Sequence, residues 1–419
     1  MNYFILIFIL LSAIGFFNPS GVLSAQAEKF LLYAAIAGGA VYAFSFGRNL
    51  TKVKYPRIAY AILIGGIFLS IFTSTAFHDQ SLTDSFKTVL SYLLPYFSFL
   101  VFMKLDVPRK KVMNTLIILS FIAAFVYFVN LYSVPSFSFG RPLEKEDLSR
   151  GILRIAIPYI ELFPLLLFYS INQWFMTRAK KWLFYGTFLM VMIFLSVTRQ
   201  IIFLSAILGL IYLLQNVTLF KKITVIVVVM LFGTIVLPRI PAYKTMLELS
   251  EEQRDENEDE ENIRIQAWRY YTIENQTNEI TPIIGNGVPS FGLSPWGKQF
   301  ESDTDTNKCF AVDVGWAGFF YYFGAITTAA LLIILIRAFL LRKPKSQTYL
   351  NYWILFLIAT SVASGIILYY FQIVSVSLVL YLVYKGKDEP SHRIENQSEN
   401  TQVKPYKGYQ QLSMSCRHG

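Results

Sequence analysis

The sequence predicts an all-α polytopic membrane protein with about twelve transmembrane helices and one large external (periplasmic) loop. Three observations support this prediction: the composition, the recurrence of apolar runs of spanning length, and the distribution of the basic residues. Hydrophobic residues make up 54% of the 419-residue chain, charged residues make up only 15%, and the mean hydropathy is +0.47. A soluble protein of this composition would need many helices that are hydrophobic on every side, all packed into one core.

Apolar runs long enough to cross a bilayer, which takes about 20 residues in a helix, recur along almost the whole chain. The predicted spans lie near residues 3–17, 29–47, 57–77, 85–103, 112–134, 152–171, 181–198, 200–216, 222–238, 312–336, 350–366 and 368–384. The segment from Met1 to Ala27 ends in LSAQA, a pattern typical of signal-peptidase sites, but it lacks a basic amino-terminal region and another span follows at once. We therefore interpret it as a first transmembrane helix, with a cleaved signal as the alternative.

The basic residues of five connecting segments fall on one side if the predicted helices alternate in direction. These residues are Arg48, Lys52, Lys54, Arg57, Lys104, Arg109, Lys110, Lys111, Arg178, Lys180, Lys181, Lys221, Lys222, Arg337, Arg342, Lys343 and Lys345. Short cytoplasmic loops carry an excess of Lys and Arg, so this side is predicted to be cytoplasmic and to hold both termini. The same distribution accounts for the net charge of +10 without a nucleic-acid partner.

The chain then divides into a first set of nine spans (1–238), a large external loop (239–311), three further spans (312–384) and a polar tail (385–419). A loop of that length without structure of its own is uncommon and is usually functional or disordered. Its middle, IRIQAWRYYTIENQ (263–276), has the periodicity of an amphipathic helix, with Ile263, Ala267, Tyr270 and Tyr271 roughly on one side. The tail is predicted to be disordered and cytoplasmic because it is polar and has no apolar periodicity.

Arg199 is the first candidate functional residue. It lies in LSVTRQIIFLSAILGL (195–210), at an external turn between two predicted spans. A charge at membrane depth costs about 2.5–3.5 kcal/mol on insertion scales and by default marks a functional site. Guanidinium presents a planar fork that matches phosphate oxygens, which favours anion binding. The alternative is an arginine that extends to the membrane surface from a helix end.

Two further cations, Arg150 and Arg154, lie in SRGILRIAIPYIE, at the external start of the predicted span near 152–171. Because they are four residues apart, they share one helix face and could form a second anion contact. The alternative is an interfacial anchor. Glu161, about two turns further on, could pair with Arg154 inside the membrane.

The large loop and the following span supply the remaining candidates. Arg264 and Arg269 lie on the predicted amphipathic helix. Gly285 and Gly287, in TPIIGNGVPSFG, allow close approach of the backbone to a ligand or to a neighbouring helix. Asp313 opens the tenth span, where a carboxylate could act as a general base or bind a sugar hydroxyl. The alternative for Asp313 is an acid favoured by the dipole of a helix N-terminus.

Several chemistries find no support in the sequence. The histidines, His78, His392 and His418, are scattered, and the two cysteines, Cys309 and Cys416, are predicted on opposite sides of the membrane. Zinc-ligand spacing, a P-loop and a Ser-x-x-Lys motif do not occur, which disfavours metal catalysis and nucleotide hydrolysis. No cofactor is therefore expected.

The order of these motifs resembles the O-antigen ligase and O-antigen polymerase superfamily of integral-membrane glycosyltransferases. Ser-x-Thr-Arg followed by an apolar Gly-Leu helix is similar to the core motif of the family. DVGWAGFFYYFG, which starts at Asp313, is similar to the opening of the next helix in polymerase-like members. The resemblance covers residues 180–335 by motif and the remainder by topology. The arginine, tryptophan and Pro-x-x-Gly-x-Gly-x-x-x-Phe pattern of the family's loop stands here as Arg264, Trp268, Pro282, Gly285, Gly287 and Phe291.

The resemblance implies a polysaccharide polymerase in a bacterial inner membrane, which joins oligosaccharide repeats carried on undecaprenyl pyrophosphate at the external face. It implies that Arg199 and Arg264 contact the pyrophosphate and stabilise charge on this leaving group. Ligases of the family carry a histidine just before the helix that begins here near Asp313. This sequence has none there, which argues against a lipid A–core ligase and leaves Asp313 as a substitute base. The expected substrate contacts are Arg150, Arg154, Trp268, Arg269, Gly285 and Gly287.

Two alternatives remain open at this point. One is a ligase that moves a finished glycan to another acceptor, and the other is a flippase that transports the lipid-linked oligosaccharide. The candidate cations on one face, the uncharged middles of the first three spans and the large external loop favour an enzyme. Besides the lipid-linked donor and membrane lipids, the partners that the resemblance implies are a chain-length regulator and a flippase.

Overall fold

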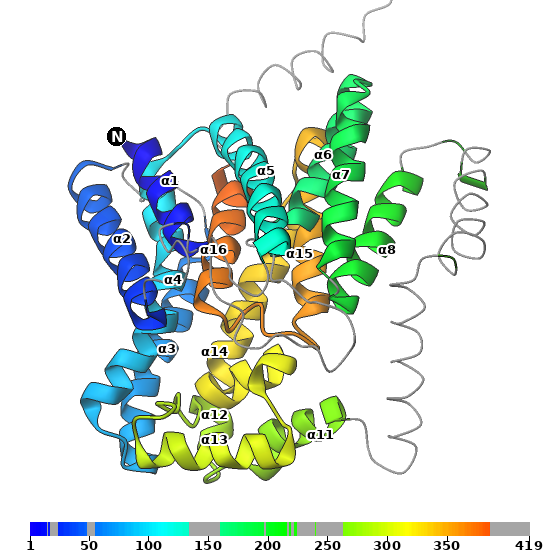
Figure 1. The fold of residues 1–419 in the computed structure, drawn as a ribbon. Coiled ribbons are helices and arrows are strands. Elements are labelled where there is room, and N and C mark those ends of the chain that lie inside the picture. Colours follow the sequence, from blue (N-terminus) through cyan, green and yellow to red (C-terminus); the bar gives the residue numbers. More distant parts are fainter. Residues whose placement is uncertain are drawn as a thin grey trace, which may run out of the picture.

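The computed structural model describes residues 1–14, 16, 24–47, 55–133, 160–196, 198–215, 218, 222–223, 239 and 263–385. Within these ranges the regular elements are all helices, arranged as an upright bundle with a layer of shorter helices at one end (Figure 1). Arg150, Arg154, nearly all of the predicted span 222–238 and the tail from residue 386 lie outside the described residues.

Among the described residues, five helices are long and apolar enough to cross a membrane. They are α2 (Ala25–Phe46), α3 (Arg57–His78), α4 (Leu82–Leu105), α5 (Arg109–Ser133) and α14 (Gly315–Leu340). Shorter apolar helices complete the bundle: α1 (Asn2–Ala13), α6 (Phe163–Thr177), α7 (Lys181–Leu195), α8 (Arg199–Gln215), α15 (Tyr349–Thr360) and α16 (Tyr370–Lys385). The described part of the chain is thus helical, with helices of the length and composition of membrane spans, whereas the number of twelve spans stays a prediction.

Helix α6 differs from the predicted span 152–171, because it continues to Thr177. It begins after a short 3-10 turn, η4 (Ile160–Leu162), and Pro164 lies in its first turn, where a missing N–H costs nothing. Asn172 interrupts the apolar pattern but not the helix. Its side chain is buried and donates to the Lys345 carbonyl at 2.8 Å, so this polar residue is compatible with a helix inside the bundle.

The helices run up and down between two ends, which we name from their contents. At the basic end lie the turns after α4 and α6 and the connection from α14 to α15 (Figure 1). The two ends of the described chain meet there: Asn2 donates to the Leu105 carbonyl at 2.7 Å, and Lys385 pairs with Asp106 at 2.8 Å. At the loop end lie the turns after α3, α7 and α15, together with the layer of shorter helices that lies outside the upright bundle (Figure 1).

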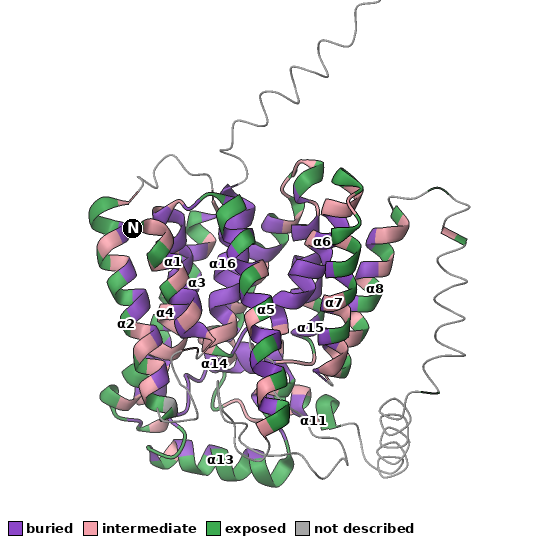
Figure 2. Cartoon of the chain, turned by 45° about the horizontal axis from the view of Figure 1, so that its top comes forward, coloured by how far each residue is buried: buried purple, intermediate pink, exposed green. Residues whose placement is uncertain are grey.

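The core lies between α4 and its neighbours α3 and α16, and buried residues continue through α14 and α15 (Figure 2). Backbone carbonyls of α4 near its proline accept side-chain hydrogen bonds. Tyr60 donates to the Tyr96 carbonyl at 2.7 Å, and Ser377 donates to the Pro95 carbonyl at 2.9 Å. These bonds fix α3 and α16 against α4 in a core that is otherwise apolar.

Candidate functional site

Arg199 is the first residue of α8, at the loop end of the bundle. Ser196 and Thr198 form the turn before it: the Thr198 hydroxyl donates to the Ser196 carbonyl at 3.2 Å, and Ile202 N donates to the Thr198 carbonyl at 3.0 Å. Arg199 and Gln200 thus already belong to α8. The Arg199 side chain is exposed at a helix N-terminus, where backbone N–H groups also favour anions.

The opposite end of α8 fixes the depth of Arg199 relative to α15. Tyr212 hydrogen-bonds to Thr348 at 2.7 Å, so the end of α8 lies beside the start of α15. From there both helices run to the loop end over similar lengths, because each residue adds about 1.5 Å. Arg199 therefore lies at the same end as Thr360 and the turn that follows α15.

The predicted amphipathic helix is α11 (Ile263–Arg269), which continues as one π-helical turn, η7 (Tyr270–Glu274). Ala267 and Tyr271 are buried as expected from the pattern, whereas Ile263 is 38% exposed. The Tyr271 hydroxyl donates to the Cys309 carbonyl at 2.7 Å. Because π-helical turns recur at functional sites, this segment is a structural candidate as well as a sequence candidate.

Trp268 connects this helix to the turn after α15. Its indole Nε1 donates to the Val362 carbonyl at 3.0 Å. Trp316, in the first turn of α14, makes a similar bond to the Ile358 carbonyl at 3.1 Å, and Trp316 N donates to the Ser361 carbonyl at 2.9 Å. The turn after α15 is thus held by α11 on one side and by α14 on the other.

Arg264 and Arg269 are both exposed on α11. Arg269 lies 4.0 Å from Glu274, and both side chains are about half exposed, so this ion pair contributes little to stability. Burial, with Asp303 nearby, raises the pKa of Tyr270 to about 12, which keeps its hydroxyl protonated. Both arginines are therefore exposed cations on this helix.

Asp313 is exposed in η8 (Ala311–Asp313), immediately before α14. Helix α11 packs against η8 and against α14. This contact brings the segment of Arg264 and Trp268 next to that of Asp313, although about 50 residues separate them in the sequence. Burial raises the pKa of the nearby Cys309 thiol, so Cys309 is not an activated nucleophile.

The glycine segment, residues 285–290, lies against a kink in α14. At Gly324 the helix leaves helical geometry with φ 76°, and the freed carbonyls of α14 accept bonds from the segment. Asn286 N donates to the Tyr321 carbonyl at 2.9 Å, and Gly287 N donates to the Tyr322 carbonyl at 3.1 Å. Of the two roles that the glycines allow, the structure shows close approach to a helix.

Neither glycine of this segment has room for a side chain. A Cβ at Gly285 would lie 2.4 Å from the Tyr322 carbonyl oxygen, and one at Gly287 would lie 2.1 Å from Ser74 Oγ. Gly324 faces the same contact, because its Cβ would lie 2.4 Å from the Ile283 carbonyl oxygen. The glycines of the loop pattern and the last glycine of DVGWAGFFYYFG therefore belong to one contact.

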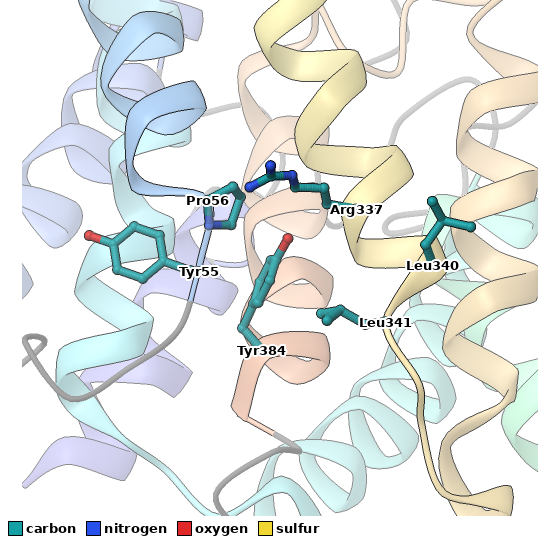
Figure 3. Close-up of a pocket in the computed structure, with 6 residues that line it drawn as sticks. All are labelled: Tyr55, Pro56, Arg337, Leu340, Leu341 and Tyr384. Carbon is teal, nitrogen blue, oxygen red and sulfur yellow. The ribbon is translucent and has the colours of Figure 1, made fainter.

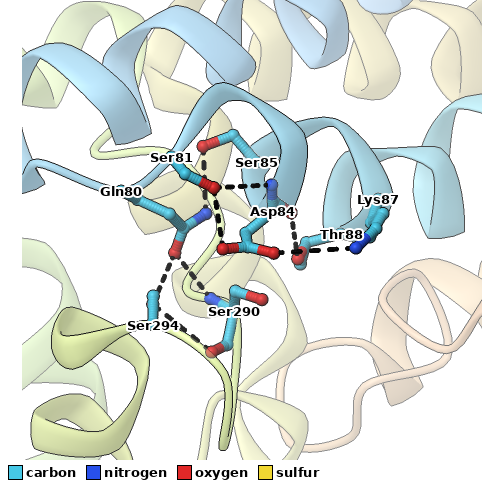
Figure 4. Close-up of polar contacts among 8 residues, drawn as sticks. All are labelled: Gln80, Ser81, Asp84, Ser85, Lys87, Thr88, Ser290 and Ser294. Carbon is cyan, nitrogen blue, oxygen red and sulfur yellow. Dashed lines mark hydrogen bonds and ion pairs between the residues drawn. The ribbon is translucent and has the colours of Figure 1, made fainter.

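The other side of the glycine segment is held by the turn between α3 and α4 (Figure 4). Gln80 donates to the Val288 carbonyl and to Ser85 Oγ, each at 3.1 Å. Its Oε1 accepts from Ser290 N at 2.8 Å and from Ser294 Oγ at 2.9 Å. All four hydrogen-bonding positions of this buried amide are thus used.

Sequence reasoning missed Gln80 and Asn286, and it set His78 aside as scattered. Three of the four Gln80 partners lie 208 to 214 residues away along the chain, so no local pattern could indicate them. His78 stacks on Trp296 with ring centroids 3.7 Å apart. The signal that the sequence offered was the short polar run from His78 to Ser81 between two apolar spans.

Glu161 lies inside the bundle. It is 1% exposed, and its carboxylate accepts from Ser375 Oγ at 3.1 Å. Its carbonyl accepts from Trp353 Nε1 at 3.1 Å. The predicted pair with Arg154 lies outside the described residues, as do the predicted contacts of Arg150.

Among the described residues no group of three or more His, Cys, Asp or Glu side chains could hold a metal ion. No protein-family model matches the chain, and no curated protein matches it. The comparisons therefore assign no family to the chain, and the structure adds where the sequence motifs lie.

Proposed function

We propose that this chain is an integral-membrane glycosyltransferase, and within that class a polymerase of lipid-pyrophosphate-linked oligosaccharide repeats. One observation carries the proposal. The loop glycines contact the last glycine of DVGWAGFFYYFG, the helix of Arg264 packs against η8, and Arg199 lies at the same end of the bundle. Motifs that were singled out separately in the sequence thus form one end of the molecule.

The proposed reaction transfers a glycan from undecaprenyl pyrophosphate to a sugar hydroxyl. The acceptor oxygen forms a bond to the anomeric carbon of the donor, and the bond from that carbon to the pyrophosphate oxygen breaks. The electron pair of the broken bond leaves with the pyrophosphate. Asp313 takes the proton of the acceptor hydroxyl. The chemistry needs no oxidant and no nucleotide.

The arginines act on the leaving group. Negative charge increases on the pyrophosphate as the bond breaks, and fixed cations stabilise it most in a site of low dielectric constant. Arg199 combines its own charge with the N-terminus of α8, a helix of 17 residues. Arg264 supplies a second cation from α11, and Trp268 holds that helix in place through Val362.

A ligase would use the same donor and the same arginines but a different acceptor. A flippase would need charges along a path through the membrane. Among the described residues, the cations lie near helix ends or outside the helices. This distribution favours a reaction at one membrane face over transport, with the loop end as the external face of a bacterial inner membrane.

The first experiment is a deletion strain whose lipid-linked and surface glycans are separated by size. Single repeats in place of a ladder are the result expected for a polymerase. Long chains that accumulate on the lipid carrier would instead identify a ligase, and an unchanged ladder would end the proposal. Full complementation by Asp313→Asn would remove Asp313 as the base.

The proposed sidedness has its own test. Cys309 is a poor reporter because it is 3% exposed, so the test uses Ser302→Cys on α13 (Pro295–Asn307) and Ser346→Cys at the basic end, both exposed, in a Cys309→Ser and Cys416→Ser chain. A membrane-impermeant maleimide should label Ser302→Cys in intact spheroplasts and Ser346→Cys only after lysis. The reverse pattern would place the loop end in the cytoplasm.

A further inference from the structure

A cavity of about 350 Å³ opens at the basic end of the bundle (Figure 3). Its walls come from the start of α3 and from the last turns of α14 and α16. The lining residues are Tyr55, Pro56, Arg337, Leu340, Leu341 and Tyr384. Small-ligand sites usually measure about 300–1,000 Å³, so this cavity is large enough for a single small polar group.

Arg337 is the charged member of this lining. Its guanidinium extends from α14 towards Pro56, and the Tyr384 ring stands beside it with the hydroxyl on the same side (Figure 3). Within the described part of the chain, the Arg337 side chain makes no ion pair and no hydrogen bond. A guanidinium offers five N–H donors and no acceptor, so this side chain suits an anion.

The surroundings of the cavity are positive. Arg57 lies over the Tyr55 ring, 5.7 Å from its centroid, at the start of α3. Asp106 is the one carboxylate that the described residues place at this end, and it pairs with Lys385 at 2.8 Å. The cavity therefore favours an anionic ligand over a neutral or cationic one.

One side of the cavity continues as an apolar surface along α14. Leu340 is 71% exposed, and Ile336 and Ile333, at helical spacing from it, are 42% and 45% exposed. In a bilayer this face of a spanning helix contacts acyl chains. A ligand with a phosphate at Arg337 and a hydrocarbon chain along Leu340 would match both parts of the surface.

We propose that this cavity binds the phosphate headgroup of an anionic phospholipid, with Arg337 as its anchor and the exposed face of α14 as the contact for an acyl chain. Basic pockets between helices at one membrane face commonly take such headgroups. The proposal does not depend on the glycosyltransferase function, because no loop-end residue takes part. It predicts a lipid that stays bound when the protein is extracted.

Native mass spectrometry of the full chain in detergent, with added phosphatidylglycerol or phosphatidylcholine, tests this proposal. Phosphatidylglycerol should be retained in preference, and Arg337→Ala should lower its apparent affinity about fivefold. Arg342→Ala removes an exposed cation at the same end that does not line the cavity, and it should retain the lipid as the unaltered chain does. Equal retention by Arg337→Ala and the unaltered chain would overturn the proposal.

Two further measurements test whether the cavity selects a phospholipid. Leu340→Glu places an acid at the cavity mouth without disturbing the core, so it should reduce phosphatidylglycerol binding even if Arg337→Ala fails to fold. Added inorganic phosphate should leave the bound lipid in place. Displacement of the lipid by millimolar phosphate, or equal retention of phosphatidylcholine, would show that the cavity lacks this selectivity.

Discussion

The two ends of the bundle carry cations for different reasons. At the basic end they occur at helix starts and helix ends alike, as Arg109 in α5 and Lys104 in α4 show. This pattern is expected where the side of the membrane, and not the helix dipole, decides their position. At the loop end Arg199 opens α8, where the dipole disfavours a cation by about 0.3–1 kcal/mol. The helix dipole therefore does not account for the position of Arg199, for which anion binding is the proposed role.

The ends also differ in how their connections are held. At the basic end the turns are short, and Lys343 closes one of them with bonds to nearby residues such as Ala338. At the loop end the glycine segment is held by residues far away in the sequence, among them Ser74 and Gln80. Distant residues also meet at the basic end, where Lys385 pairs with Asp106, but there the contact joins helix ends, whereas at the loop end such contacts hold a segment without regular structure.

The largest expected effect is at Arg199. Arg199→Ala should lower polymer formation about a hundredfold, which is typical for loss of one group that stabilises developing charge. Arg199→Lys keeps the charge without the planar fork and should be intermediate. The assay is the glycan ladder of the deletion strain complemented with each variant at matched expression.

Lys298→Ala is the control for this comparison, because Lys298 is an exposed cation on α13 at the same end. It should restore a normal ladder. A normal ladder with Arg199→Ala would remove the contrast between the two ends. An equal loss of polymer with Lys298→Ala would show that the effect of Arg199 depends only on the net charge of the loop end.

The next effect concerns the fit of the glycine segment. Gly287→Ala combines a Cβ at 2.1 Å from Ser74 Oγ with a positive φ, so it should lower the free energy of unfolding by about 2–4 kcal/mol. Gly292 also has a positive φ, but open space surrounds its Cβ position, so Gly292→Ala should cost only about 1–2 kcal/mol. Thermal unfolding in detergent measures both, and equal losses would mean that backbone strain alone matters there.

A smaller loss is expected at Gln80. Gln80→Leu leaves Ser290 N and the Val288 carbonyl buried without their partner, which should cost about 1–3 kcal/mol. Lys87→Ala, on the helix that follows Gln80, removes only an exposed contact to Asp84 at 3.9 Å and should change stability by less than about 0.5 kcal/mol. Thermal unfolding again provides the measurement, and no difference between the variants would show that the glycine segment is held by other contacts.

These contacts mark how far the sequence could predict the structure. Apolar periodicity predicted the helical membrane class, and the pattern in 263–276 predicted α11, because both depend on neighbours in the chain. The contact of Gly285 with Tyr322, and that of Gln80 with Ser290, join residues that no local pattern connects. The glycine pattern did indicate close approach, but only the fold shows that the partner is a helix.

The smallest expected effect tests the basic end. Lys343 donates to the Ala338 carbonyl and to Asn351, and burial lowers its pKa from 10.5 to about 8. The unfolded chain therefore binds more protons than the folded chain between these values, so stability should rise as the pH increases from about 8 towards 10.5. Lys343→Met lacks this contribution. Unfolding temperatures in detergent compare the unaltered chain with Lys343→Met. Their difference should shift in favour of the unaltered chain between pH 7.5 and about 9.5. A difference independent of pH would mean that Lys343 is solvated in the folded chain.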